Sequence, residues 1–136
     1  MKVVVDTNVV AYFLLGTQEF VDETRRFWRR VREPMAPALW EAELANAMWM
    51  AVRAKVLAAE EAPKRLTLAA ALGITSVSTK SLWHGALTRA LRSGVAVYDT
   101  LFVELASREH LLLATFDDKV LKSSPDLARR PDTLTG

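Results

Sequence analysis

Four acidic residues of this 136-residue chain are candidates for chemistry, and three of them are aspartates at the carboxyl end of a predicted strand. They are Asp6 after the strand Lys2–Val5, Asp99 after Val95–Val97 and Asp117 after Leu111–Thr115. The carboxyl ends of parallel strands lie along one edge of an open sheet, so the three carboxylates are expected to converge. Each aspartate also precedes a predicted helix, and capping of that helix is the competing explanation.

The fourth acid, Glu43, lies within a predicted helix over Leu39–Val56, where it cannot cap the helix. A carboxylate that borders a wide apolar helix face is costly to bury unless it is paired or binds a cation. Asn46 lies one turn further along on the same side, whereas Glu41 is about 200° around the helix and is expected to face solvent. Surface exposure of Glu43, or an arginine partner for it, is the alternative.

Four converging carboxylates would repel one another and raise their pKa values unless a cation neutralised them. The sequence has no cysteine, and its two histidines, His84 and His110, are not adjacent to any candidate acid and are interpreted as structural or surface residues. Mg²⁺ or Mn²⁺ therefore fits the donor set better than Zn²⁺. Such an ion, or a pair about 3.5–4 Å apart, suits phosphodiester cleavage because it lowers the pKa of a bound water and stabilises the charge that builds on phosphoryl oxygens.

The elements that must position these acids follow a repeated strand-then-helix order, which predicts an α/β fold with a mainly parallel sheet covered by helices on both faces. A further strand is predicted at Ile74–Ser78. The other helices are predicted between Thr17 and Glu33, over Glu60–Leu72, around Leu82–Leu91, over Asp99–His110 and over Asp117–Lys122. Pro34 and Pro37 end the first of these helices. The second has Pro63 in its first turn and Gly73 at its end, and Gly94 ends the third.

Length and a hydrophobic content of 51% predict one domain over residues 1–136, without internal repeats or linkers. The segment after Pro125, within a C-terminal tail of residues 124–136, is expected to be loosely attached. The longest apolar run, Val9–Leu15, is far shorter than the roughly 20 residues that cross a bilayer, and no leader is recognised. With no cysteine, these features favour a cytoplasmic protein without a membrane partner.

A net charge of +2 is too small to imply nucleic-acid binding by itself. A local basic run is interpreted mainly as a solvated helix face; it comprises Arg25, Arg26, Arg29, Arg30 and Arg32. The five glycines fit neither a P-loop nor a dinucleotide-binding fingerprint. An aspartyl phosphatase would have a second aspartate where Asn8 stands, and a receiver domain would have an acid pair near the first strand, where Asp6 stands alone.

Four segments together resemble the motifs of the PIN-domain family, most closely those of VapC-type toxins from toxin–antitoxin pairs. They are Val4–Asn8, with the first acid; Glu41–Met48, with a glutamate and then an asparagine; Val97–Phe102; and Leu113–Asp117, with a closing threonine-x-aspartate. The resemblance covers about residues 2–123. It implies a three-layer α/β/α sandwich around a sheet of four or five strands, Mg²⁺- or Mn²⁺-dependent cleavage of single-stranded RNA, a homodimer, and an antitoxin partner that blocks the acidic site.

The resemblance also implies roles for individual residues. Asp6, Glu43 and Asp99 would hold the principal ion, and Asp117 would complete the site directly or through water, with Asp118 as its immediate competitor. Thr115, Asn8 and Asn46 would orient the carboxylates, although Asn8 is equally a candidate helix cap. Tyr98 and Phe102 are interpreted as core residues, with stacking on RNA bases as the alternative. The arginine run would help to bring RNA to the acidic pocket. A PIN-like RNA- or protein-binding module, or a PIN nuclease of RNA processing, is the alternative.

Overall fold

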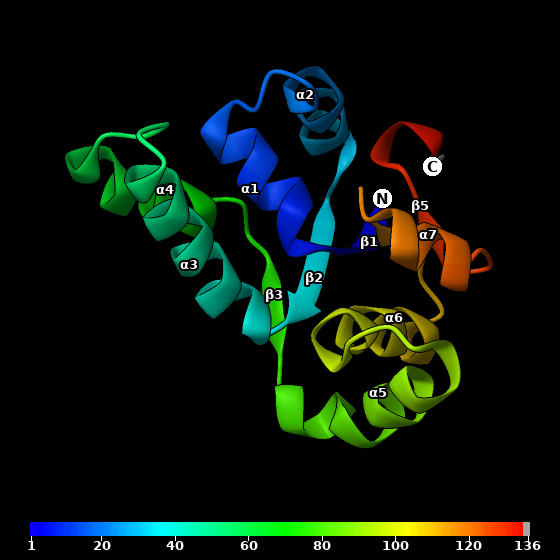
Figure 1. The fold of residues 1–136 in the computed structure, drawn as a ribbon. Coiled ribbons are helices and arrows are strands. Elements are labelled where there is room, and N and C mark those ends of the chain that lie inside the picture. Colours follow the sequence, from blue (N-terminus) through cyan, green and yellow to red (C-terminus); the bar gives the residue numbers. More distant parts are fainter. Residues whose placement is uncertain (135–136) are drawn as a thin grey trace.

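The computed structural model describes residues 1–134 and shows an α/β fold with a five-stranded, all-parallel sheet (Figure 1). In sheet order the strands are β3 (Thr75–Val77), β2 (Glu33–Pro37), β1 (Lys2–Val5), β4 (Leu113–Ala114) and β5 (Ala128–Arg129). The helices are α1 (Thr7–Leu15), α2 (Val21–Arg30), α3 (Leu39–Arg53), α4 (Ala62–Ala70), α5 (Thr79–Ser93), α6 (Val97–Glu109) and α7 (Asp118–Ser123), with 3₁₀ turns η1 (Ala59–Glu61) and η2 (Pro131–Thr133). The predicted fold class is confirmed.

The helices flank the sheet in two groups. Helix α1 contacts α2, α3 and α4, and Figure 1 shows α1, α3 and α4 on one side of strands β1 to β3. Helix α5 packs against α6, which contacts β1, β2 and β4 from the other side. Between these two groups of helices, α1 begins directly after the carboxyl end of β1.

Among residues 1–134, none of the helices has the length and hydrophobicity that a membrane-spanning segment requires.

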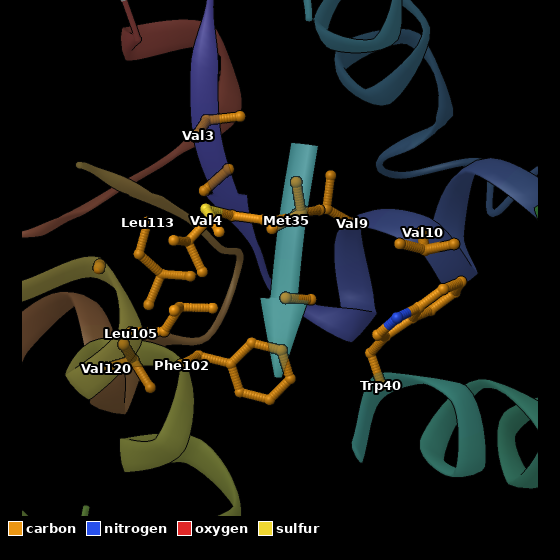
Figure 2. Packing of buried hydrophobic residues seen from close by; sticks show 14 of the residues in the cluster. Val3, Val4, Val9, Val10, Met35, Trp40, Phe102, Leu105, Leu113 and Val120 are labelled. Carbon is orange, nitrogen blue, oxygen red and sulfur yellow. The ribbon is translucent and has the colours of Figure 1, made fainter. Parts of the chain in front are cut away.

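The core beneath α6 holds that helix against the sheet. Figure 2 shows Phe102 and Leu105 of α6 beside Val4 of β1 and Leu113 of β4. Phe102 is 1% exposed, as predicted, and burying a side chain of this size contributes about 1.5–3 kcal/mol. Tyr98 is 66% exposed, so its interpretation as a core residue is wrong. The fully buried residues of α6 begin at Thr100. In the first turn, Val97 is partly buried against the core, whereas Tyr98 is exposed.

Strand β2 was not among the predicted strands. Pro34 and Pro37 are interpreted from the sequence only as the end of the preceding helix. Proline cannot donate a hydrogen bond to a sheet and is unusual in a central strand. In the structure β2 nevertheless lies between β3 and β1, with Pro34 paired in register with Val3. All four of its residues from Pro34 to Pro37 are buried, and this tertiary burial outweighs the local signal.

The strand predicted at Val95–Val97 is not formed. Gly94 adopts a left-handed conformation (φ 74°) after α5, Val95 is buried in the connection, and α6 begins at Val97. A short run of apolar residues has the same composition in a strand as in the start of a buried helix, so periodicity cannot separate them. Asp99 consequently lies in the first turn of α6 and not at a strand end.

The C-terminal segment is attached to the domain, contrary to the expectation of a loose tail. Strand β5 pairs with β4, and Leu134 is 2% exposed. Arg26 of α2 forms a two-pronged ion pair with Asp132, at 2.7 and 3.0 Å, and Arg30 donates to the carbonyl oxygens of Pro131 and Leu134. The basic run of α2 is therefore only partly a solvated face, since two of its arginines hold this segment. Residues 135–136 of the predicted tail lie outside the described residues.

Candidate active site

All four predicted acids line one open pocket of about 370 Å³, although they come from different parts of the chain. Asp6 follows β1, Glu43 lies on α3, Asp99 lies in the first turn of α6, and Asp117 precedes α7. The predicted convergence is therefore found in the structure, but only Asp6 and Asp117 arrive from the ends of strands. Asp99 is brought to the pocket by the packing of α6 on the sheet.

Asp6 is the most buried of the four acids and the most firmly held. One carboxylate oxygen, Oδ1, accepts a hydrogen bond of 2.8 Å from the backbone N–H of Thr7, which caps α1. The other, Oδ2, accepts from Thr115 Oγ1 at 2.7 Å and from Asn8 Nδ2 at 3.5 Å. Burial and, to a smaller extent, the neighbouring charges of Asp99 and Glu43 raise the pKa of Asp6 to about 7, although the hydrogen bond from Thr115 partly opposes this rise. A carboxylate in this position gains stability from a cation.

Glu43 lies on the pocket side of α3, and the exposed Glu41 lies away from it, as predicted. Thr7 Oγ1 donates a hydrogen bond of 2.7 Å to Glu43 Oε1, which joins α3 to the start of α1. Burial and the charge of Asp99 raise the pKa of Glu43. Asn46 also lines the pocket, but within residues 1–134 its amide contacts Met50 Sδ at 3.6 Å and no carboxylate.

The carboxylate of Asp99 is the one among the four acids that neither caps a helix nor accepts a hydrogen bond within residues 1–134. Ala96 occupies the cap position of α6, and within residues 1–134 the Asp99 carboxylate receives no hydrogen bond, so helix capping does not explain it. Half-burial raises the pKa of Asp99, as does the charge of Asp117, whereas Lys119 lowers it. Asp99 therefore offers two uncommitted carboxylate oxygens to the pocket.

Asp117 both caps a helix and lines the pocket. Its Oδ1 accepts from the backbone N–H groups of Lys119 and Val120 at 2.8 and 3.4 Å, and its own N–H donates to Thr115 Oγ1 at 3.0 Å. Capping occupies Oδ1, and within residues 1–134 Oδ2 accepts no hydrogen bond. Asp118 is exposed and is not among the pocket-lining residues, so the structure favours Asp117 over its neighbour as the fourth acid.

Thr115 and Asn8 connect these acids. Thr115 is fully buried, and its hydroxyl donates to Asp6 while it accepts from the N–H of Asp117, so it links two acids of the pocket. Asn8 contacts Asp6, and its Oδ1 accepts from the N–H of Phe116 at 3.3 Å. Because Asp6 is the cap of α1, the alternative role of Asn8 as that cap is wrong.

The donor set of the pocket suits a hard divalent cation. It consists mainly of carboxylate and neutral oxygen groups, and burial, together with the neighbouring negative charges, raises the pKa of Asp6, Glu43 and Asp99. Among residues 1–134, no three acidic or histidine side chains stand close enough together to form a complete metal site by themselves. Mg²⁺ typically keeps several water ligands and uses only one or two carboxylates directly, which an open pocket of this kind permits.

Three residues of the site were missed from the sequence. Thr7 orients Glu43, Tyr12 lines the pocket from α1, and Lys119 places a positive charge near Asp99. The helical spacing of Asn8 and Tyr12, four residues apart, could have indicated that Tyr12 shares the face of Asn8. No local signal predicts the contact between Thr7 and Glu43, which are separated by 36 positions in the chain.

Comparison with known families agrees with this geometry. The profile of the PIN domain matches residues 3–124, which is most of the chain and includes all four acids. The chain belongs to the PIN domain family. PIN domains are in general nucleases that use divalent metals, which supports a hydrolase acting on nucleic acid. A search of curated proteins finds no match to the chain.

Proposed function

We propose that this PIN domain is an Mg²⁺- or Mn²⁺-dependent endoribonuclease that cleaves single-stranded RNA. The observation that carries the proposal is the single pocket lined by Asp6, Glu43, Asp99 and Asp117, in which burial and mutual repulsion raise the pKa of three of the acids. A buried cluster of negative charge is unfavourable by itself and becomes favourable when a cation binds.

The side chains of the pocket have two proposed roles, to bind the ion and to orient the groups that bind it. Asp6, Glu43 and Asp99 would hold the ion, some of them directly and the others through its water ligands, and Asp117 would complete the site directly or through a water. A bound divalent ion would supply an activated water and would stabilise charge on the phosphoryl oxygens. Thr115 holds Asp6 in one orientation, and this restriction lowers the cost of assembling the ligands around an ion.

The proposal is tested by removing one carboxylate at a time. Asp99→Asn and Glu43→Gln should each lower Mn²⁺-stimulated cleavage of an unstructured RNA oligonucleotide by at least about hundredfold, since the loss of a group that merely orients a ligand already costs about 10- to 100-fold. Glu41→Gln, on the solvent side of the same helix, is the matched control and should keep full activity. Circular dichroism should show all three variants folded. Undiminished cleavage by pure Asp99→Asn protein would refute the site.

The biological role is proposed from the resemblance to VapC-type toxins: a cytoplasmic, homodimeric toxin held inactive by an antitoxin. Exposed apolar side chains spaced four residues apart on α5, namely Trp83, Leu87 and Leu91, support a protein interface. A short antitoxin-like reading frame immediately upstream, whose product co-purifies with the chain, is the expected result. A gene that stands alone and a protein that purifies without a partner would favour a PIN nuclease of RNA processing.

A further inference from the structure

The acidic pocket contains many hydrogen-bond acceptors and few free donors. A phosphodiester group brings only acceptor oxygens, so a pocket that binds it needs N–H or O–H groups in addition to a cation. The hydroxyl of Thr7 already donates to Glu43 at 2.7 Å, and the amide of Asn8 lies between Asp6 and the N–H of Phe116. These two donors serve the carboxylates and are not directed to a substrate.

Tyr12 is a hydrogen-bond donor in this pocket whose hydroxyl does not donate to any carboxylate within residues 1–134. It lies on α1, one turn after Asn8, and it lines the pocket together with the four acids. Within residues 1–134, the Tyr12 hydroxyl makes no hydrogen bond, and it is not a buried unsatisfied group, so it is accessible from solvent. Burial and the charges of Glu19 and Asp6 raise the pKa of Tyr12, which keeps the hydroxyl protonated and able to donate.

The ring of Tyr12 is fixed by an aromatic cluster. It stacks on Phe20 with ring centroids 4.5 Å apart and planes inclined by 17°, and Phe116 lies 5.5 Å away. Phe116 stands between Thr115 and Asp117 in the chain, and the guanidinium group of Arg130 lies 4.7 Å from its ring centroid. The C-terminal segment thus supports the same aromatic group that directs Tyr12 to the pocket. A hydroxyl held in one position loses little entropy when it binds a ligand.

We propose that the Tyr12 hydroxyl donates a hydrogen bond to a phosphodiester oxygen of the RNA substrate, which makes Tyr12 a substrate-binding residue of the acidic pocket. This inference rests on the proposed nuclease function and adds to it a residue that contacts the substrate and does not bind the metal. Asn46 of α3 also lines the pocket, but within residues 1–134 its amide already donates to the weak sulfur acceptor of Met50.

The test is Tyr12→Phe, which removes the hydroxyl and keeps the ring that stacks on Phe20. Steady-state cleavage of a single-stranded RNA oligonucleotide in Mn²⁺ should show kcat/KM lowered by about 10- to 100-fold, the usual range for a lost hydrogen bond to a charged group. The increase in melting temperature that Mn²⁺ causes should equal that of the wild type. Tyr98→Phe, which alters the exposed tyrosine of α6, is the matched control and should cleave normally.

The possible outcomes separate this inference from the function on which it rests. If the wild type cleaves RNA and Tyr12→Phe cleaves it within twofold as well, the role of Tyr12 is refuted while the nuclease stands. If Tyr12→Phe loses its thermal response to Mn²⁺, Tyr12 belongs to the metal site and the inference is also wrong. If the wild type cleaves no RNA in Mg²⁺ or Mn²⁺, both proposals fail together.

Discussion

Replacing Asp6 with asparagine should remove a pH-dependent loss of stability from the metal-free protein. The carboxyl of Asp6 has a pKa of about 7 in the folded chain and an ordinary value of 3.8 when unfolded. Between these values the folded state binds a proton that the unfolded state has released. The free energy of unfolding of the wild type therefore falls as pH rises from about 4 to about 7, and this contribution is constant above pH 7.

The size of the effect follows from the pKa difference. From pH 5 to pH 8 the loss is about two pKa units, or about 2.7 kcal/mol at about 1.4 kcal/mol per unit. Asparagine carries no charge, so Asp6→Asn lacks this contribution. The weakened hydrogen bond with Thr115 lowers stability at every pH and cancels when the two pH values are compared.

Urea unfolding of both proteins at pH 5 and pH 8, in the presence of EDTA, measures this difference. The free energy of unfolding of Asp6→Asn minus that of the wild type should increase by about 2.7 kcal/mol between the two pH values, equivalent to about 10 °C in melting temperature for a domain of this size. Asp126→Asn, which removes the same charge from an exposed position, is the control and should show no such increase. A difference that changes by less than about 0.5 kcal/mol would refute the reasoning.

Two further predictions concern the metal and the fold. Millimolar Mn²⁺ should raise the melting temperature of the wild type, because the ion binds only the assembled pocket, and it should raise that of Asp99→Asn much less; equal shifts would mean that the ion binds elsewhere. Gly85→Ala should lower the free energy of unfolding by about 1–3 kcal/mol, because the new methyl group would overlap the Glu104 carboxylate, which Arg89 and Arg108 hold at 2.9 and 2.7 Å. In a Glu104→Ala background the same substitution should be neutral or stabilising in urea unfolding, since alanine is favoured over glycine in a helix by about 1 kcal/mol.

Local patterns were enough to predict most of the helices. The apolar periodicity of α3, α4 and α5 was visible in the sequence, as were Pro63 in the first turn of α4 and Gly94 at the end of α5. These features act within one or two turns of the chain, so a single sequence displays them. The ends of the predicted helices differ from the observed ones by a few residues.

Strand β2 and the C-terminal segment depended on contacts that no local pattern contains. Pro34 and Pro37 argue against a strand, yet they are buried between two neighbouring strands. Strand β5 has only two residues, and its segment is held by Arg26 and Arg30 of α2, about a hundred positions earlier in the chain. Burial and ion pairing between distant parts of the chain determine the conformation of such segments. These interactions outweigh the intrinsic secondary-structure preference of a few residues.

By itself, the sequence determined the chemistry that the site can use. Without cysteine, and with both histidines far from the candidate acids, only oxygen ligands remain, and the order of the four motifs indicated the PIN family that the comparison then showed. Only the tertiary structure decided which groups meet. It showed that Asp117 both caps α7 and lines the pocket, that Asp99 arrives on a helix, and that Thr7 holds Glu43. Side-chain contacts between distant segments depend on how helices pack on the sheet, and that packing is a property of the whole chain.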